Sequence, residues 1–266
     1  MRWRLHWKLP SAGPFEIRNW TRGLSIELPN TGAAAQIYYR TFSAPQLANL
    51  LTDRLSLGMH FLDVGAHVGE YSLLAASLVG PTGRVTAIEP QRDMVAVIRE
   101  NARRNGLGNV AVHSIALSDS AQRLALAVDN RSGGAWLSSV QGALSESVDC
   151  APLDSFLDSL GGARVDLAKV DAAGNEARVF VGARKSLTVG VLPLFVYKLY
   201  HPDVVAERFG HDGSTVISLL NDLGYEQTLL GKGGHRIASM AHVTDVIGPI
   251  WYSVPVLACR LGEGTT

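Results

Sequence analysis

Residues 61–72, FLDVGAHVGEYS, have the residue types and spacing of a ligand-binding turn. Apolar residues 61–64 predict a buried strand, Gly65 and Gly69 allow a tight turn, and a helix begins after them. Such a turn points main-chain N–H groups at a ligand, beside the partial positive charge of a helix N-terminus. A dinucleotide fingerprint needs a second glycine two residues after the first, and His67 stands there. The spacing therefore argues against NAD.

Glu89 supplies a second chemical signal, because it ends the apolar strand RVTAIEP one helix beyond the glycines. A carboxylate there accepts hydrogen bonds from both hydroxyls of a ribose, since its two oxygens lie in one plane. The alternative is a strand end that only faces solvent. The turn upstream favours ribose binding.

Strands and helices alternate around these residues. Helical patterns at 71–79 and 91–107 separate the first strands from a third at 109–119. Two more strands, at 165–171 and 191–200, lie on either side of another helix, and the tail adds a helix and two strands. This alternation predicts an α/β fold with a doubly wound sheet.

These motifs resemble the FkbM-type class I S-adenosylmethionine-dependent methyltransferases, a family that O-methylates natural products and sugars. Three segments match in order over roughly residues 45–230: DVGAHVGEYS with AIEP, then IALSD, then KVDAAGNE followed by VFVGA. The resemblance implies a Rossmann-like sheet of seven strands with an antiparallel end. It also implies S-adenosylmethionine as the methyl donor and a hydroxyl or carboxyl acceptor.

The chain departs from the family pattern in its second half. The family usually has K-[IV]-D-V-E-G-x-E at the fourth strand, and Ala173 stands where that pattern has its first glutamate. Lys198 stands where the fifth strand of the family commonly ends in a glutamate. These two losses predict an altered acceptor site. Lys198 either attracts an acidic acceptor or pairs with Asp171 or Glu176.

The reaction sets what the site must contain. Methyl transfer is an in-line displacement at a carbon activated by a sulfonium, so alignment supplies much of the rate. Asp171, at the carboxyl end of its strand, is predicted to touch the donor or the acceptor. His201, in LYHPD, is the candidate base, because a pKa of about 6.5 suits neutral pH better than one of about 4. The alternative for His201 is a surface loop.

Two features concern the acceptor and a metal. Trp136, in the glycine-rich segment RSGGAWLSS, is predicted to lie on a mobile loop that closes over the acceptor, or to be a hydrophobic plug. No metal site is predicted, because hard cations need several oxygen ligands. Ala173 removes one carboxylate, and Lys198 adds positive charge nearby.

Composition limits the classes of function. The 266 residues are 47% hydrophobic with a formal net charge of zero, which fits one sizeable core and argues against a general nucleic-acid binder. Cys150 and Cys259 lie far apart without CxxC spacing, so a reduced, cytoplasmic compartment is predicted. The longest apolar run, VGVLPLFVY, is too short to span a bilayer, and the N-terminus lacks the apolar region of a signal peptide.

Residues 1–43 are predicted to form a strand-rich β/α extension of a methyltransferase domain at 44–266. MRWRLHWKL alternates basic and apolar residues, which predicts a strand with two unlike faces. It is either a surface for a membrane or acidic partner or, as we favour, an edge strand that could also pair two subunits in a homodimer. Residues 14–42 are predicted to hold one or two more short strands, and residues 44–55 an amphipathic helix.

The preferred function is S-adenosylmethionine-dependent O-methylation of a hydroxyl on a small molecule, a sugar or secondary metabolite. Two alternatives stay open: aminopropyl transfer on the same fold, and a binding protein that keeps the cofactor turn without turnover. The predicted cofactor-binding residues are Asp63, Gly65, Ala66, His67, Gly69, Ser72, Glu89, Pro90, Ala116, Leu117, Ser118 and Asp171. The predicted catalytic residues are Asp171 and His201, and the predicted substrate-binding residues are Trp136, Lys198 and His201.

Overall fold

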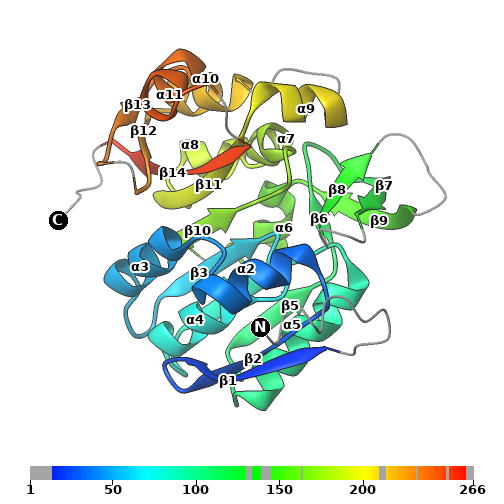
Figure 1. Cartoon of the computed structure of the whole chain (residues 1–266). Helices are drawn as coiled ribbons and strands as arrows, with labels where there is room; N and C mark the ends of the chain where they lie inside the picture. The colour runs from blue at the N-terminus through cyan, green and yellow to red at the C-terminus, as the bar shows by residue number, and fades with distance from the viewer. Residues whose placement is uncertain are drawn as a thin grey trace.

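A computed structural model describes residues 14–129, 134–138, 145–162, 164–209, 214–231, 233–249 and 252–261. Its centre is an eight-stranded sheet in the order β13-β12-β14-β11-β10-β3-β4-β5 (Figure 1). The five parallel strands at its centre and one edge are β3 (His60–Val64), β4 (Arg84–Ile88), β5 (Val110–His113), β10 (Leu167–Val170) and β11 (Leu194–Tyr200).

The other edge of this sheet carries the antiparallel end that the resemblance implied. β14 (Ser253–Arg260) runs antiparallel between β11 and β12 (Tyr225–Leu229). These seven strands confirm the predicted sheet, and β13 (Arg236–Ile237) adds a short eighth strand at the edge. Within this sheet, the first strand along the chain is β3. The chain then adds β4 and β5 on one side of β3 and returns to add β10 on the other side. The carboxyl ends of β3 and β10 therefore meet where the strand order reverses, which is where open α/β sheets bind ligands.

Helices cover both faces of the sheet, and the alternation of side chains along β3 divides the core between them. Leu62 packs with helices α6 (Leu153–Ser159), α7 (Glu176–Val181), α8 (Arg184–Thr188), α10 (Thr215–Asp222) and α11 (Met240–Ile247). Phe61 points to the other face and packs with α3 (Pro45–Arg54) and α4 (Glu70–Val79), and α5 (Arg92–Arg104) contributes Met94 and Ala102 to the same cluster. Successive strand residues point to opposite faces, so the sheet is buried on both sides.

A second, four-stranded sheet lies beside the main one. It has the order β6-β9-β7-β8 and consists of β6 (Ala116–Leu117), β7 (Gln122–Val128), β8 (Ala135–Ser138) and β9 (Ser145–Ala151). The predicted third strand at 109–119 is therefore two strands in two sheets. The prediction of a loop at Trp136 is also wrong, because Trp136 pairs with Ala127 across the β7–β8 ladder. Helix α9 (Pro202–Phe209) lies next to β8 (Figure 1).

The described part of the N-terminal segment adds two strands and a helix. β1 (Phe15–Thr21) and β2 (Leu24–Leu28) form an antiparallel pair, as predicted for residues 14–42. Helix α2 (Gly32–Arg40) follows the two strands, which agrees with a β/α extension, and Thr31 Oγ1 caps its N-terminus by accepting from Ala34 N at 3.3 Å. The alternating segment MRWRLHWKL lies outside the described residues.

Helix α5 holds β2 in place through two asparagine side chains. Asn101 exchanges hydrogen bonds with the main chain of Glu27, at 2.7 and 3.1 Å, and Asn105 does the same with Ser25, at 2.7 Å each. Apolar residues of β2 share one hydrophobic cluster with α3 and α4. We therefore propose that the described part of the N-terminal extension, residues 14–43, packs on the domain at 44–266 as an added layer.

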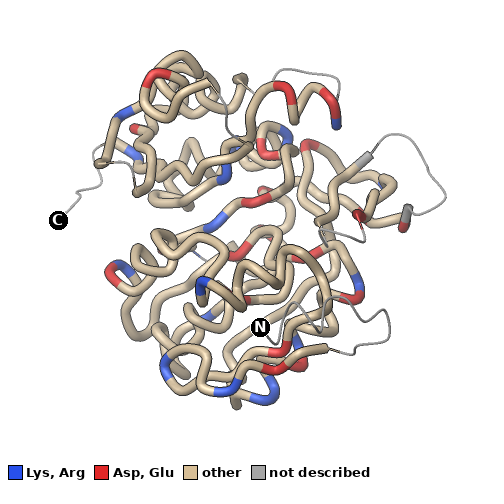
Figure 2. Tube along the Cα trace, viewed as in Figure 1, with Lys and Arg blue, Asp and Glu red and all other residues tan. Residues whose placement is uncertain are grey.

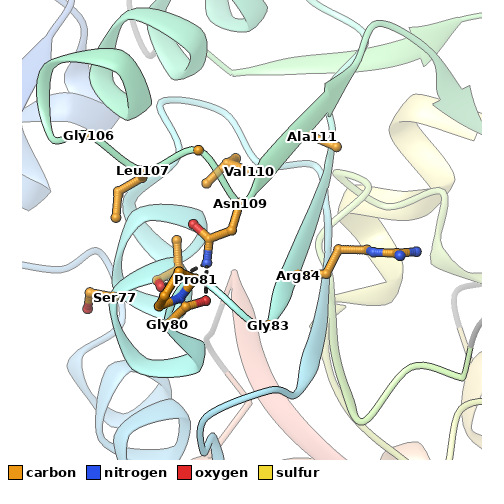
Figure 3. A pocket seen from close by; sticks show the side chains of 12 residues that line it. Ser77, Gly80, Pro81, Gly83, Arg84, Gly106, Leu107, Asn109, Val110 and Ala111 are labelled. Carbon is orange, nitrogen blue, oxygen red and sulfur yellow. Dashed lines mark hydrogen bonds between the residues drawn. The ribbon is translucent and has the colours of Figure 1, made fainter.

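The charged residues are spread over the molecule, and a cavity lies at each end of the sheet. Basic and acidic residues are interspersed along the described trace (Figure 2), and no helix in the described ranges is long and apolar enough to cross a membrane. One cavity, of about 760 Å³, lies at the amino ends of β4 and β5, where Asn109 donates to the carbonyls of Ala76 and Gly80 (Figure 3). It contains none of the predicted site residues. A larger one lies at the opposite end.

Candidate active site

A cavity of about 800 Å³ lies over the carboxyl ends of the central parallel strands. The sequence-predicted residues that line it are Gly65, Ala66, His67, Glu89, Pro90, Ala116, Leu117, Trp136, Asp171 and Lys198. Five other predicted residues do not line it: Asp63, Gly69, Ser72, Ser118 and His201. The structure thus brings together most of the predicted cofactor side and part of the predicted acceptor side.

Gly65 lets two strand ends approach each other closely at the floor of this cavity. Its φ is +72°, and a Cβ on it would lie 1.9 Å from the carbonyl oxygen of Asp171. Its N–H donates to Ile88 O at 2.8 Å, which ties the turn to β4. Only glycine fits between these two main-chain segments, so the close approach of the ends of β3 and β10 at the cavity floor depends on Gly65.

Glu89 is held at the end of β4 by main-chain donors. Its two carboxylate oxygens accept from His67 N at 2.8 Å and from Gln91 N at 2.9 Å. Burial raises the pKa of Glu89 to about 7, although these hydrogen bonds oppose the rise. Each oxygen keeps a second lone pair, so a rigid pair of acceptors faces the cavity, as a ribose diol requires.

Lys169 forms a buried brace beneath the turn. Its Nζ lies 3.0 Å from Asp63 Oδ1 and donates to Gly65 O at 2.7 Å. Ser72 Oγ donates to the other Asp63 oxygen at 2.6 Å. Burial opposes the charge of Lys169, but the nearby Asp63 carboxylate outweighs it and raises the pKa of the ammonium. Asp63 and Ser72, both predicted to bind the cofactor, are fully buried; Asp63 binds Lys169, and Ser72 binds Asp63.

Glu70 lines the cavity, although sequence reasoning missed it. Its carboxylate accepts from Ser43 N at 2.9 Å and from Ser43 Oγ, and burial raises its pKa to about 7. The adjacent Tyr71 hydroxyl accepts from Ala44 N at 2.8 Å, so the start of α4 is bound to the segment that opens α3. The available signal was an acidic residue directly after Gly69, in the first turn of a helix.

Asp171 is the central polar group on the other side of the cavity. Lys198 Nζ lies 3.1 Å from its Oδ2, and the Tyr200 hydroxyl donates to its Oδ1 at 2.9 Å. Burial opposes ionisation, but Lys198 and Lys169 lower the pKa of Asp171 to about 2. The sequence left open whether Lys198 attracts an acidic acceptor or pairs with a carboxylate of the protein, and the structure shows an ion pair with Asp171.

Glu176, the other predicted candidate partner of Lys198, makes no such pair. Its Oε1 accepts from Ala172 N at 2.7 Å and from Gly174 N at 3.3 Å. Burial, aided by the negative charge of Asp171, raises the pKa of Glu176 to about 8. The side chain is therefore mostly protonated at neutral pH and closes the turn after β10.

His201 lies between β11 and α9, outside the residues that line the cavity. Its Nδ1 accepts from Asp203 N at 3.3 Å and lies 3.5 Å from Asp203 Oδ2, so the ring faces the start of its own helix. Ser118 is buried, and its Oγ donates to Asp119 Oδ1 at 3.2 Å. Gly69 caps α4 with a φ of +82°. These three predicted residues support the walls of the cavity instead of lining them.

An arginine and three aromatic rings close the acceptor side. The guanidinium carbon of Arg208, on α9, lies 4.8 Å from the ring centroid of Trp136, 5.7 Å from that of Tyr200 and 5.8 Å from that of Tyr252. All four residues line the cavity. Sequence reasoning found only Trp136, because the others belong to segments without a recognisable motif.

The described residues fit S-adenosylmethionine. The glycine turn leaves room for a close ligand, Glu89 offers two acceptors for a ribose, and Glu70 offers an acid for an ammonium group. Asn175, in the cavity wall, is 1% exposed, and its Oδ1 has no hydrogen-bond partner within the described chain, so a donor on a ligand would satisfy it. Among those residues no group of three or more His, Cys, Asp or Glu side chains is arranged to hold a metal ion.

The sheet order, the glycine turn at its reversal point and the acid at the end of the next strand define a class I S-adenosylmethionine-dependent methyltransferase. The chain belongs to the FkbM methyltransferase family, because the model of the methyltransferase FkbM domain matches residues 63–226. S-adenosylmethionine is accordingly its cofactor.

Individual relatives share shorter segments. A 23S rRNA (uracil(1939)-C(5))-methyltransferase RlmD of Acinetobacter baylyi is 42% identical over 71 residues, which is 26% of this chain and 15% of that protein. A protein-L-isoaspartate O-methyltransferase of Methanothrix thermoacetophila is 36% identical over 75 residues, 27% of this chain and 36% of that protein. The chain thus spans well under two thirds of either relative. The structure of the METTL16 methyltransferase domain is similar in fold, with a TM-score of 0.50 at 14% identity over 91% of this chain and 75% of that one.

Proposed function

We propose that the protein transfers the methyl group of S-adenosylmethionine to a hydroxyl of a small molecule, a sugar or a secondary metabolite. The observation that supports this most is one continuous cavity with two unlike walls. Main-chain groups and Glu89 form one wall, and Asp171 with aromatic and basic side chains forms the other. Its volume of about 800 Å³ suits a cofactor and a small acceptor better than a macromolecular surface.

The cofactor wall fixes the donor. Glu89 would hold the ribose hydroxyls, Ala116 and Leu117 would contact the adenine, and Glu70 would bind the ammonium group; all four residues line the cavity. When bound, S-adenosylmethionine supplies an electrophilic methyl group, whose bond to sulfur breaks as its bond to the acceptor oxygen forms.

Asp171 orients the acceptor hydroxyl by accepting its hydrogen bond. With a pKa of about 2 it is a weak base, so the hydroxyl proton passes to the Asp171 carboxylate late, when the forming bond to carbon has made the oxygen acidic, and from there to water. Lys198 and Tyr200 keep the carboxylate ionised and fix its rotation. We assign the polar role at the reacting oxygen to Asp171 in place of His201, because His201 faces α9.

We also propose a cytoplasmic location, because both cysteines are free. A homodimer formed through the N-terminal strand stays a prediction. The formal net charge of zero supports a small-molecule acceptor over a nucleic acid.

The test begins with mass spectrometry of the purified protein for bound S-adenosylhomocysteine, followed by calorimetric titration with S-adenosylmethionine. Transfer of a labelled methyl group is then measured over a panel of hydroxylated sugars and phenols. Asp171→Asn should lower kcat by at least about tenfold while changing the affinity for S-adenosylhomocysteine by less than about threefold. Asp158→Asn, at an exposed ion pair with Lys185, is the matched control.

Two results would overturn the proposal. Absence of S-adenosylmethionine binding at millimolar concentration excludes turnover with this donor and favours the binding-protein alternative. If the methyl group is transferred only to nitrogen or carbon atoms, the protein is still a methyltransferase, but its acceptor is not a hydroxyl.

A further inference from the structure

Arg208 stands out among the charged groups of the acceptor wall. Its Nη1 donates to Ala173 O at 2.7 Å and its Nη2 donates to the Tyr252 hydroxyl. A guanidinium has five N–H groups, so these two bonds leave most of its donors unused. The rings of Trp136, Tyr200 and Tyr252 fix the guanidinium without neutralising it.

The other cations that line the cavity are already neutralised. Lys169 pairs with Asp63 at 3.0 Å and Lys198 pairs with Asp171 at 3.1 Å. Within the ranges that the structure describes, no carboxylate lies within 4.0 Å of the Arg208 guanidinium. Arg208 is therefore the cavity cation with capacity for a further anion.

We infer that the acceptor carries an anionic oxygen group, a carboxylate or a phosphate, and that Arg208 binds it. This inference rests on the proposed function and names its substrate class. The planar fork of an arginine matches two oxygens of one carboxylate or phosphate. The ring of Trp136, against Arg208, offers a flat surface to the part of the acceptor that carries the hydroxyl.

Local geometry carries this recognition, because the cavity is not basic as a whole. Asp129 and Glu207 also line it, and their charges oppose a general attraction for anions. The anion must therefore sit at the Arg208 fork to be bound. The sequence left two roles open for Lys198, attraction of an acidic acceptor or an ion pair with Asp171 or Glu176; because Lys198 pairs with Asp171, the attraction of an acidic acceptor falls to Arg208.

The experiment measures affinities of matched probes for the full-length protein saturated with S-adenosylhomocysteine. The first pair is 4-hydroxybenzoate against 4-hydroxybenzamide, and the second is glucose 6-phosphate against glucose. In the pair whose anion matches the natural acceptor, the anionic probe should bind roughly tenfold tighter than the neutral one. The two pairs distinguish a carboxylate from a phosphate.

Variants then assign the preference to Arg208. Arg208→Gln should reduce the ratio of the two affinities to about twofold or less, whereas Arg208→Lys should keep an intermediate ratio. Arg236→Gln, at an exposed ion pair with Glu226, should leave the ratio unchanged. A purely structural role for Arg208 would weaken both probes of a pair equally, and thermal unfolding checks that each variant folds.

Equal affinity for anionic and neutral probes in both pairs overturns the inference, and so does a preference that survives in Arg208→Gln. Either result leaves the proposed function intact if S-adenosylhomocysteine still binds. Failure of the wild-type protein to bind S-adenosylhomocysteine counts against the proposed function instead.

Discussion

The two walls of the cavity are built in different ways. The cofactor wall comes mainly from β3, β4 and the turns after them, and it presents main-chain groups and one carboxylate held by main-chain donors. The acceptor wall combines side chains from β8, β10, β11 and α9. A wall made of main chain tolerates little change, whereas a wall made of side chains can change specificity one residue at a time. This difference explains how the chain keeps the glycine turn while it lacks two carboxylates of the family pattern.

The strongest test of this difference is Gly65→Ala. The new Cβ would lie 1.9 Å from the Asp171 carbonyl at a φ of +72°, so β3 and β10 must separate. We expect a loss of more than about 4 kcal/mol in the free energy of unfolding, together with loss of cofactor binding. Urea denaturation and calorimetric titration with S-adenosylhomocysteine measure the two effects.

Gly108→Ala is the matched control, because nothing lies within 4 Å of its added Cβ. Its free energy of unfolding should change by less than about 1 kcal/mol. If Gly65→Ala folds and binds the cofactor like the wild type, the cofactor wall is not rigid, and the proposed difference between the cofactor wall and the acceptor wall is wrong.

Lys169→Met tests the brace beneath the cofactor wall. It removes the only cation within 4 Å of Asp63 in the described ranges and leaves a fully buried carboxylate without its counter-ion. We expect a destabilisation of about 3–5 kcal/mol. The double variant Lys169→Met, Asp63→Asn should recover part of it, because neither residue of this pair is then charged. Lys185→Met, which breaks an exposed pair with Asp158, should cost less than about 0.5 kcal/mol. Equal losses for Lys169→Met and Lys185→Met would contradict a buried brace.

The sequence allowed most of the sheet and cofactor wall to be predicted. Strand, turn and helix are contiguous in residues 61–72, so spacing alone positions Gly65 against the helix. Glu89 could be predicted because it follows the glycine turn by one helix and one strand. The same local pattern did not reveal that Asp63 faces inward, since the direction of its side chain depends on Lys169, about a hundred residues later.

The acceptor wall was less predictable for the same physical reason. Arg208, Tyr252 and Trp136 meet only because α9, the segment before β14 and β8 converge in space. No spacing rule links residues from three separate elements. The small sheet was also missed. Strands β6 and β8 have two and four residues, too few to show alternation, and the seven-residue strands β7 and β9 become evident only through their pairing with each other.

Glu89→Gln tests whether the predicted ribose ligand acts in binding. The amide turns one acceptor oxygen into an NH₂ group, which then faces either His67 N, now at 2.8 Å, or Gln91 N, now at 2.9 Å, donor against donor. We expect the affinity for S-adenosylhomocysteine to fall by about 10- to 100-fold. Glu100→Gln, an exposed carboxylate on α5 that binds Arg103 and Arg104, should leave the affinity unchanged. A Glu89→Gln protein with wild-type affinity would remove Glu89 from the site.

Glu176→Gln has no effect on stability at low pH, and its effect grows as the pH rises. Burial raises the pKa of Glu176 from 4.5 to about 8, so the folded protein favours its protonated form. Its contribution to stability is fully present below about pH 4.5 and is lost as pH rises through about 8. The variant is neutral at every pH and keeps the acceptor oxygen for Ala172 N. Its free energy of unfolding should therefore exceed that of the wild type by roughly 3 to 5 kcal/mol at pH 9 and match it near pH 4, because each pKa unit corresponds to about 1.4 kcal/mol. Denaturation curves at both pH values measure this difference.

Glu70 and Glu89, with pKa values of about 7, leave some pH dependence in both proteins. A wild type and variant with parallel pH profiles would mean that Glu176 is ionised in the folded state, and the negative charge beside Asp171 would then make the acceptor wall less receptive to an anion than its arginine suggests.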